Sequence, residues 1–339
     1  MPNRVTMDII GKKAGVSKST VSYVLSGKKK ISREIEERVL QVVDELNYHP
    51  QLSAPKLVKQ ELKIISLCIP MESKRLSDDD YYLPLIEGAL DRAHKEGYQL
   101  IINKIAQDDK ISERAFYRSL NTVDGVILAN LRKDHIYDNA LKQATIPYVV
   151  NGTPEKGELD KVFYVDLDLV GVGFQASQYL IKTGHNNIFY INMPKEFIQS
   201  RQRLEGFKLA HKEAGIAWKE ENICYLNVNI EDSYTKAREV IRKRGNEING
   251  FVVANDIMAM GVVRALQEEK ISIPDRVAVI GMGGNMLAGV THPQLTTIDF
   301  SPYRCGYESA GMLIEIITRK RIQPSHTLIP GSLVQRETA

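Results

Sequence analysis

From Lys63 onward the sequence alternates short apolar runs with longer stretches whose apolar residues recur at helical spacing. Strands that are apolar throughout are typical of parallel sheets, because helices bury both faces of such a sheet. The apolar runs lie at 64–69, 99–102, 123–128, 147–150, 188–191, 251–254 and 277–280. About 280 residues of this pattern are more than one sheet usually needs, so the pattern predicts two doubly wound parallel-sheet lobes.

Positive charge is concentrated at the N-terminal end of the chain. The 339 residues carry a net charge of +3, yet residues 1–63 hold 12 Lys and Arg against 7 Asp and Glu, which leaves 33 against 35 for the remainder. A basic excess confined to a small segment is typical of a part that contacts phosphate. We therefore expect nucleic acid to bind the N-terminal segment alone.

Residues 1–49 predict a headpiece of three short helices. Thr6 is a natural N-cap for a helix at 7–14, Gly15 permits a sharp turn, and Ser17 can cap a second helix. Ser32 starts a third helix at 33–47. The positions of the second helix that point outward are Lys18, Ser19, Ser22 and Tyr23. A short helix with an apolar back and a polar, partly basic front suits the DNA major groove.

The turn after the second helix carries three lysines, Lys28 to Lys30. An isolated lysine triplet is most often a solvated turn. Beside a helix-turn-helix, contact with DNA phosphate is the better interpretation, and it includes Lys30.

Several classes of protein are disfavoured by composition. The three cysteines, Cys68, Cys224 and Cys305, are far apart and predict neither a disulfide nor a metal site, as in a reduced cytosol. Neither a membrane-span-length apolar run nor an N-terminal signal segment is evident, so we expect a soluble, cytoplasmic protein. Without a phosphate-cradling glycine loop, a metal-ligand cluster or a nucleophile elbow, we expect no enzyme activity and no cofactor.

The headpiece resembles that of the LacI/GalR (lactose/galactose repressor) family. The resemblance rests on residues 5–7, 14–22, 32–34 and 45–50, and it continues in order to the C-terminus. It implies a dimer that binds a pseudo-palindromic operator and is switched by a ligand. By position, Lys18, Ser19 and Tyr23 match residues that contact bases, whereas Thr6, Ser17, Ser22, Ser26 and Ser32 match residues that contact the DNA backbone.

Tyr23 departs from the family pattern. Relatives often have Arg there, which can grip guanine with two hydrogen bonds, whereas Tyr offers one hydroxyl and an aromatic edge. The operator half-site is therefore expected to differ from the commonest family sequence. The alternative is that Tyr23 packs against the third helix.

Residues 50–62 form a predicted hinge. The resemblance implies that this segment folds into a helix on DNA, with Ala54 in contact and Leu57 wedged into the minor groove. Pro55 is unusual here, because proline is tolerated only in the first turn of a helix; a helix that starts near Ser53 or Ala54 would accommodate it. A plain linker in which Leu57 has no role is the alternative.

The expected fold is a small all-α helix-turn-helix headpiece plus an α/β periplasmic-binding-protein-like body at 63–339. The resemblance implies three crossings between the lobes. They are expected near 164–168, 295–298 and 324–328. Lobe one then spans about 63–164 and 296–325, and lobe two about 165–295 and 326–339.

The cleft between two such lobes is where a ligand is expected, because the carboxyl ends of the strands face it. Arg203 and Asn255 match positions that bind ligand hydroxyls in sugar-responsive relatives. Asp256 is a contact or a helix N-cap, and the aromatic candidates stack on a sugar or fill the core. The predicted effector-binding residues are Tyr81, Tyr82, Asn151, Arg203, Asn255, Asp256 and Phe300.

Gly283 stands where sugar-binding relatives commonly have an Asp that binds two hydroxyls. The absence of this Asp disfavours a small neutral sugar, held in the usual way, as the effector. It favours a larger glycoside, a phosphorylated ligand or a protein corepressor instead. Arg201 and Arg203 offer charge for a phosphate, although Arg201 also fits a surface position.

These features predict a ligand-controlled transcriptional regulator, a repressor of carbohydrate-use genes. The alternative within this class is a global regulator whose corepressor is a phosphorylated carrier protein or a purine. A solute-binding protein shares the body fold, but the complete headpiece disfavours it. Apolar stripes that could serve a dimer or the core lie at 83–90 and 259–266, and without leucine heptads a dimer rather than a tetramer is expected.

Overall fold

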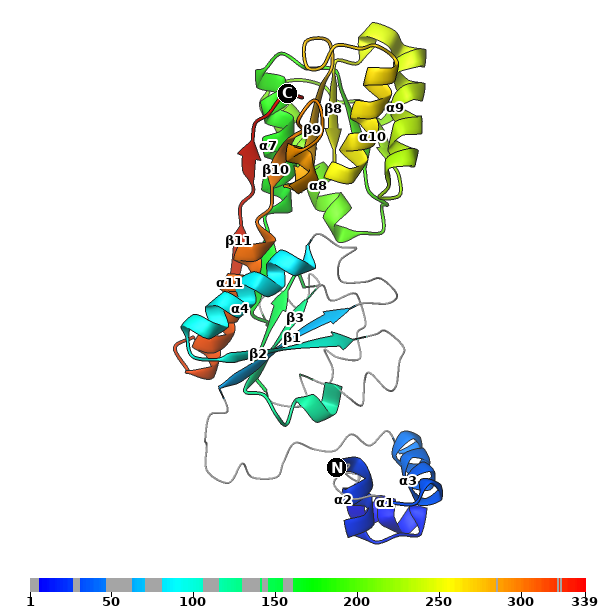
Figure 1. Cartoon of the computed structure of the whole chain (residues 1–339), viewed down its shortest axis with the longest axis vertical. Coiled ribbons are helices and arrows are strands. Elements are labelled where there is room, and N and C mark those ends of the chain that lie inside the picture. The colour runs from blue at the N-terminus through cyan, green and yellow to red at the C-terminus, as the bar shows by residue number, and fades with distance from the viewer. Residues whose placement is uncertain are drawn as a thin grey trace.

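The computed structural model describes residues 6–26, 31–46, 63–70, 81–105, 116–129, 141, 146–154, 161–284, 286–321, 323 and 325–339. These residues form a helical headpiece and an α/β body with two sheets (Figure 1). The predicted fold class is confirmed. The predicted hinge, with Ala54, Pro55 and Leu57, lies outside the described residues, as does the turn that contains Lys30.

The headpiece consists of α1 (Met7–Ala14), α2 (Lys18–Ser26) and α3 (Arg33–Glu45) around one small core. Thr6 caps α1 as predicted, since its side chain accepts a hydrogen bond from the amide of Ile9. Gly15 adopts a left-handed conformation with φ of 67°, which only glycine tolerates easily and which turns the chain into α2. The apolar side chains of each helix face this core, so the opposite side of α2 is exposed to solvent.

The first lobe is built on a six-stranded parallel sheet. Its order is β11-β5-β4-β3-β1-β2 among the described residues. Helices α4 (Tyr82–Lys95) and α11 (Pro302–Ile317) pack together and cover one face. The strands are β1 (Ile64–Pro70), β2 (Gln99–Ile105), β3 (Gly125–Ala129), β4 (Tyr148–Asn151), β5 (Tyr164–Leu167) and β11 (His326–Ile329).

The second lobe repeats the arrangement with the order β12-β10-β9-β8-β6-β7. All of its described pairings are parallel except that of β10 with β12. Helices α7 (Leu169–Lys182) and α8 (Ile198–Glu213) pair with each other, as do α9 (Ile230–Arg244) and α10 (Asp256–Glu268). The strands are β6 (Ile188–Asn192), β7 (Ile223–Tyr225), β8 (Gly250–Val253), β9 (Ala278–Gly283), β10 (Thr296–Asp299) and β12 (Ser332–Val334).

The first crossing between the lobes lies within the predicted range 164–168, and the other two lie just beyond the predicted ranges 295–298 and 324–328. Strand β5 belongs wholly to the first sheet, β10 to the second and β11 to the first, so the chain crosses after Leu167, Asp299 and Ile329. The predicted lobe boundaries at 164, 295 and 325 therefore need correction. The reason is that each connecting segment first completes a strand, whose backbone groups pair within one sheet, before it crosses.

Glycines allow α4 and α11 to approach closely. A Cβ atom at Gly306 would overlap the backbone carbonyl oxygen of Leu85, and one at Gly88 would overlap that of Tyr303. The helix pair therefore packs backbone against backbone, which places the start of α4 next to the strand ends of the first sheet.

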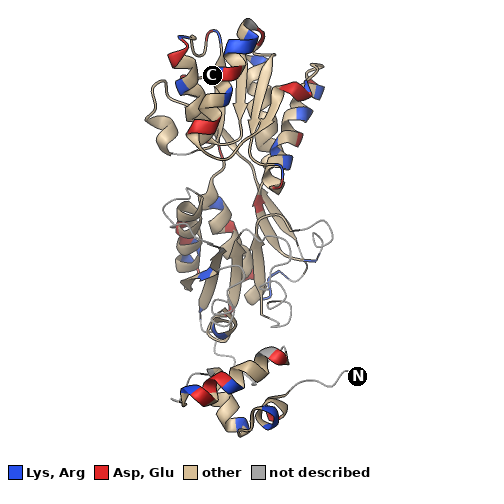
Figure 2. Ribbon diagram, turned by 90° about the vertical axis from the view of Figure 1, so that its right-hand side faces the viewer, with Lys and Arg blue, Asp and Glu red and all other residues tan. Residues whose placement is uncertain are grey.

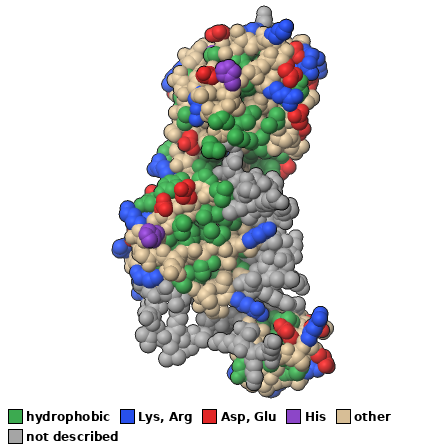
Figure 3. Space-filling model, in the orientation of Figure 1, with side chains coloured by type: hydrophobic (Ala, Val, Ile, Leu, Met, Phe, Trp, Pro, Cys, Tyr) green, Lys and Arg blue, Asp and Glu red, His purple; other side chains and the backbone are tan. Residues whose placement is uncertain are grey.

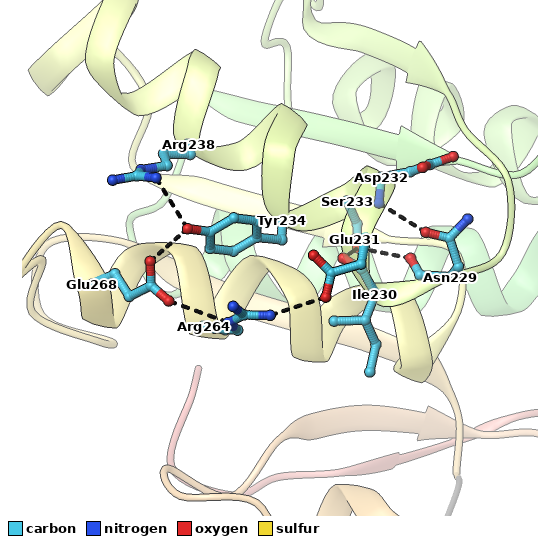
Figure 4. A network of polar contacts seen from close by, with 9 residues as sticks. All are labelled: Asn229, Ile230, Glu231, Asp232, Ser233, Tyr234, Arg238, Arg264 and Glu268. Atoms are coloured by element: carbon cyan, nitrogen blue, oxygen red, sulfur yellow. Dashed lines mark hydrogen bonds and ion pairs between the residues drawn. The ribbon is translucent and has the colours of Figure 1, made fainter.

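Charged residues link α9 to α10 on the outside of the second lobe (Figure 4). Arg264 of α10 pairs with Glu231 of α9 at 3.0 Å and with Glu268 at 3.2 Å. The Tyr234 hydroxyl donates to Glu268 and accepts from Arg238, and the Arg264 guanidinium lies 4.5 Å from the Tyr234 ring centroid. Because these groups are solvent-exposed, the network orients the helix pair more than it stabilises the fold.

Candidate functional site

The predicted DNA-reading residues of α2 lie on the surface of the headpiece. Lys18, Ser19 and Tyr23 are exposed, Tyr23 with 40% of its surface accessible, and Ser22 is half-buried. Both signs of charge occur on the headpiece helices (Figure 2). The Lys18 Nζ atom lies 2.7 Å from a carboxylate oxygen of Asp8 in α1.

The predicted backbone-contact residues are arranged around this face. Thr6, Ser17 and Ser32 are exposed, while the side chain of Ser26 lies outside the described part. Ser17 caps α2, since its Oγ accepts a hydrogen bond from the Thr20 amide at 3.1 Å. The front of α2 is therefore polar and accessible, and its back is held by the headpiece core.

On the first lobe, a chain of hydrogen bonds begins at Tyr81. The Tyr81 hydroxyl donates to Asn151 Oδ1 at 2.8 Å, and Asn151 Nδ2 donates to the Ser309 hydroxyl at 3.3 Å. Asn151 is fully buried, and burial raises the pKa of Tyr81 well above its ordinary value. These bonds fix the Asn151 amide at the carboxyl end of β4.

Asp166 of β5 contributes a buried carboxyl group beside this chain. It accepts hydrogen bonds from the Thr153 hydroxyl and, at 2.7 Å, from the Leu167 amide. Burial raises the pKa of Asp166, although these hydrogen bonds and the Arg203 charge oppose the shift. Gln202 Nε2 of α8 donates to Thr153 at 3.5 Å, so the two lobes meet here.

On the second lobe, Arg203 of α8 is only 6% exposed. Its Nη1 donates to the Ala254 carbonyl at 3.0 Å, and its guanidinium carbon lies 4.9 Å from the Phe300 ring centroid. Burial lowers the pKa of Arg203, while the nearby charges of Asp256 and Asp166 oppose that shift. Arg203 therefore carries a desolvated charge flanked by carboxylates.

Three buried polar atoms on β6 and α8 lack a protein partner. Within the described residues, Tyr190 Oη, Gln202 Oε1 and Arg203 Nε are buried and make no hydrogen bond. A buried polar atom left without a partner is destabilising, so such atoms normally bind water or a ligand. Because Gln202 also contacts Thr153 of the other lobe, these atoms make the region around the lobe contact the candidate ligand site.

Asn255 and Asp256 differ from the prediction in their roles. The N-cap of α10 is Asn255, whose Oδ1 accepts from the Ile257 amide at 2.8 Å, and not Asp256. Asp256 is 1% exposed and accepts from the Thr297 hydroxyl at 2.6 Å. Since a Cβ at Gly281 would overlap Asp256 Oδ1, the carboxylate lies directly against β9.

The aromatic candidates divide between the cleft and the core. Tyr82 and Phe300 are 8% and 7% exposed and belong to the main core cluster. The Arg203 guanidinium lies over the Phe300 ring. Of the three, Tyr81 is the one whose hydroxyl joins the cleft hydrogen bonds.

Several cleft residues were not predicted from the sequence. Tyr190 and Asp166 lie within apolar strands and resemble core positions, and Gln202 precedes Arg203 without a motif of its own. Arg201, in contrast, is exposed and lines a surface hollow of about 450 Å³ with Leu204 and Trp218. It therefore offers no charge to the cleft. The residues that sequence reasoning missed are Thr153, Asp166, Tyr190, Gln202 and Thr297.

Apolar side chains reach the surface of both lobes (Figure 3). Leu83 and Leu90 of α4 are 51% and 49% exposed, which leaves part of the predicted 83–90 stripe available to a second protomer. The 259–266 stripe of α10 is mainly core, because Val263 and Leu266 are buried. Within the described residues, no helix is long and apolar enough to cross a membrane.

Both parts of the chain match known protein families. Residues 6–51 match the model of bacterial regulatory proteins of the lacI family, and residues 177–339 match a periplasmic binding protein-like domain. The transcriptional regulator CelR of Thermobifida fusca is 28% identical over 99% of this chain and 98% of its own length. The ribose operon repressor of Escherichia coli (strain K12) is 29% identical over 98% of this chain and 99% of its own.

Solved structures agree with these relatives. A CelR–cellobiose complex is 27% identical with a TM-score of 0.73 and covers 99% of this chain and 100% of its own. A Lac repressor dimer bound to operator, 21% identical with a TM-score of 0.69 over 99% of both chains, supports the fold alone.

The transcriptional repressor PurR of Vibrio vulnificus (strain CMCP6) is 30% identical over 98% of both chains. With a three-helix headpiece, an α/β body of two lobes and this full-length similarity, the chain belongs to the LacI family of DNA-binding transcriptional regulators.

Proposed function

We propose that this protein is a dimeric repressor of carbohydrate-use genes whose effector is an uncharged sugar of about disaccharide size. The observation that carries the proposal is the group of buried, unpartnered polar atoms on Tyr190, Gln202 and Arg203. Because the family acts on operator DNA, the proposed site of action is the cytoplasm.

The chemistry of these three atoms suits hydroxyl groups. Arg203 Nε can only donate a hydrogen bond, Gln202 Oε1 can only accept, and the Tyr190 hydroxyl can do either. A hydroxyl both donates and accepts, so neighbouring hydroxyls of one sugar can serve all three atoms. A ligand with acceptors alone would leave Gln202 Oε1 unpaired.

The charge of the cleft disfavours a phosphorylated ligand. The single guanidinium of Arg203 is already close to the carboxyl groups of Asp166 and Asp256. A phosphate would add negative charge near these buried carboxyl groups. An uncharged ligand avoids this repulsion.

Two observations favour a sugar larger than a monosaccharide. Gly283 at the end of β9 has no side chain to hold the hydroxyls of a small sugar. The similar regulator CelR binds cellobiose in its solved complex.

The cleft also supports control of DNA binding. Gln202 and Thr153 come from different lobes, and a ligand between them would bind one arrangement of the lobes more tightly than another. Such differential affinity shifts the population of lobe arrangements and thereby the geometry of the two headpieces of a dimer.

The base-reading assignment can be tested by selection from a randomised duplex pool. Lys18→Met and Tyr23→Phe each remove a donor aimed at base edges, so each should relax the preference at one or two positions, with about 1–3 kcal/mol less discrimination there. The control is Lys12→Met, an exposed lysine of α1 that is not a predicted reader. If Lys18→Met and Tyr23→Phe lower the affinity for all sequences alike, these residues only position the headpiece.

Thermal unfolding of the full-length protein tests the effector class. The panel contains neutral disaccharides, monosaccharides, sugar phosphates, purines and a phosphorylated carrier protein. A ligand at about 100 times its Kd adds about 2.7 kcal/mol to the free energy of unfolding, which raises Tm by several degrees. We expect the largest shift with a neutral disaccharide. A shift confined to sugar phosphates, purines or the carrier protein would contradict the proposal.

A further inference from the structure

The predicted base reader Lys18 already has an anionic partner within the headpiece. Its Nζ lies 2.7 Å from Asp8 Oδ2, with 63% and 57% of the two side chains exposed. Lys18 is the first residue of α2, and Asp8 lies in the first turn of α1. The pair therefore joins the supporting helix to the reading helix at the surface predicted to contact DNA.

We infer that Asp8 is a positioning residue that raises the sequence specificity of DNA reading by Lys18. The inference rests on the proposed role of α2 in DNA recognition. A lysine ammonium ends a flexible stem and carries three N–H donors, so without restraint it can reach a phosphate as easily as a base edge. Asp8 accepts a hydrogen bond from Nζ, which restrains the position of the ammonium group at the surface predicted to contact DNA.

The carboxylate of Asp8 also repels DNA phosphates, in specific and non-specific complexes alike. Binding to non-specific DNA depends mainly on phosphate contacts. The repulsion lowers both affinities and leaves their ratio nearly unchanged. The restraint on Lys18 is therefore the effect of Asp8 that widens the gap between specific and non-specific affinity.

The headpiece contains a second ion pair that serves as a matched control. Lys13 Nζ lies 2.8 Å from Glu45 Oε2, with 48% and 45% of the side chains exposed, and the pair joins α1 to α3. Neither residue matches a predicted DNA contact. Glu45→Gln breaks a pair of similar length whose side chains are also about half exposed, and it changes the net charge by the same amount as Asp8→Asn.

The experiment measures Kd for two duplexes by fluorescence anisotropy at one salt concentration. One duplex carries the sequence that the wild-type protein selects from a randomised pool, and the other is a scrambled version. Full-length Asp8→Asn should bind the scrambled duplex more tightly and lower the specificity ratio roughly threefold, a size typical of an exposed ion pair. Glu45→Gln should retain the wild-type ratio.

A double-mutant comparison shows whether Asp8 acts through Lys18. In a Lys18→Met background, Asp8→Asn should leave the specificity ratio unchanged, because the group that it positions is gone. If Asp8→Asn changes the specificity ratio no more than Glu45→Gln does, Asp8 is only one more surface charge and the inference is wrong. The inference is also wrong if Asp8→Asn still changes this ratio in the Lys18→Met background. A wild-type protein that selects no sequence would instead overturn the proposed DNA reading itself.

Discussion

Replacing Arg203 with lysine is expected to abolish the response to the effector while the protein still folds and binds DNA. Lysine keeps the positive charge near Asp166 and Asp256 but lacks the guanidinium fork that reaches the Ala254 carbonyl and presents Nε to the cleft. The thermal shift caused by the best neutral sugar should disappear. The change in operator affinity that this sugar causes should be lost as well.

The neutral variant Arg203→Met is expected to have the larger effect on stability. It removes the hydrogen bond to the buried Ala254 carbonyl, which costs about 1–3 kcal/mol, and the positive charge that favours the ionised form of Asp166. Because Arg203 now opposes the upward pKa shift of Asp166, that pKa should rise further in the variant. Protonated Asp166 carries no charge to bury, so the destabilisation should shrink as pH falls through the raised pKa and grow as pH increases.

Arg201→Met is the matched control for both variants. Arg201 lies on the same helix but is exposed outside the cleft. Its replacement should leave the effector response and the pH dependence of stability unchanged. A full response in Arg203→Lys would remove Arg203 from the effector site.

Gly306→Ala is expected to destabilise the first lobe by about 3 kcal/mol or more. The added methyl group would overlap the backbone carbonyl of Leu85, which cannot move without separating α4 from α11. Since Tyr81 precedes α4 and Ser309 lies on α11, this separation should also disturb the hydrogen bonds that hold Asn151. Chemical denaturation and the effector-induced thermal shift measure the two consequences.

Gly311→Ala provides the control in the same helix. A Cβ at Gly311 would approach only the guanidinium of Arg92, at 2.7 Å, and the end of that flexible side chain can move aside. This variant should remain close to wild-type stability, because alanine also favours the helix more than glycine does. Equal losses in both variants would mean that backbone contact between α4 and α11 is not what limits the first lobe.

Local sequence patterns were sufficient to predict the headpiece helices and the fold class. Thr6, Gly15 and Ser17 act on backbone groups within three or four residues, so their capping and turning roles can be predicted without tertiary information. The apolar runs predicted strands because burial on both faces leaves a continuous apolar signature, as in β3 and β6. The exact crossing points could not be read from local patterns, because pairing with a distant strand decides where β5, β10 and β11 end.

The sequence by itself determined the three headpiece helices, the strands at the seven apolar runs, the polar front of α2 and the place of Arg203 at a strand-following helix. Only the tertiary structure decided which polar groups form the cleft. Tyr190 and Asp166 occupy apolar strands and resemble core residues until the second lobe brings Gln202 and Arg203 beside them. The same holds for Asp8, whose meeting with Lys18 depends on the angle between α1 and α2. Such contacts join residues distant in sequence, and their chemistry depends on desolvation that exists only after the chain has packed.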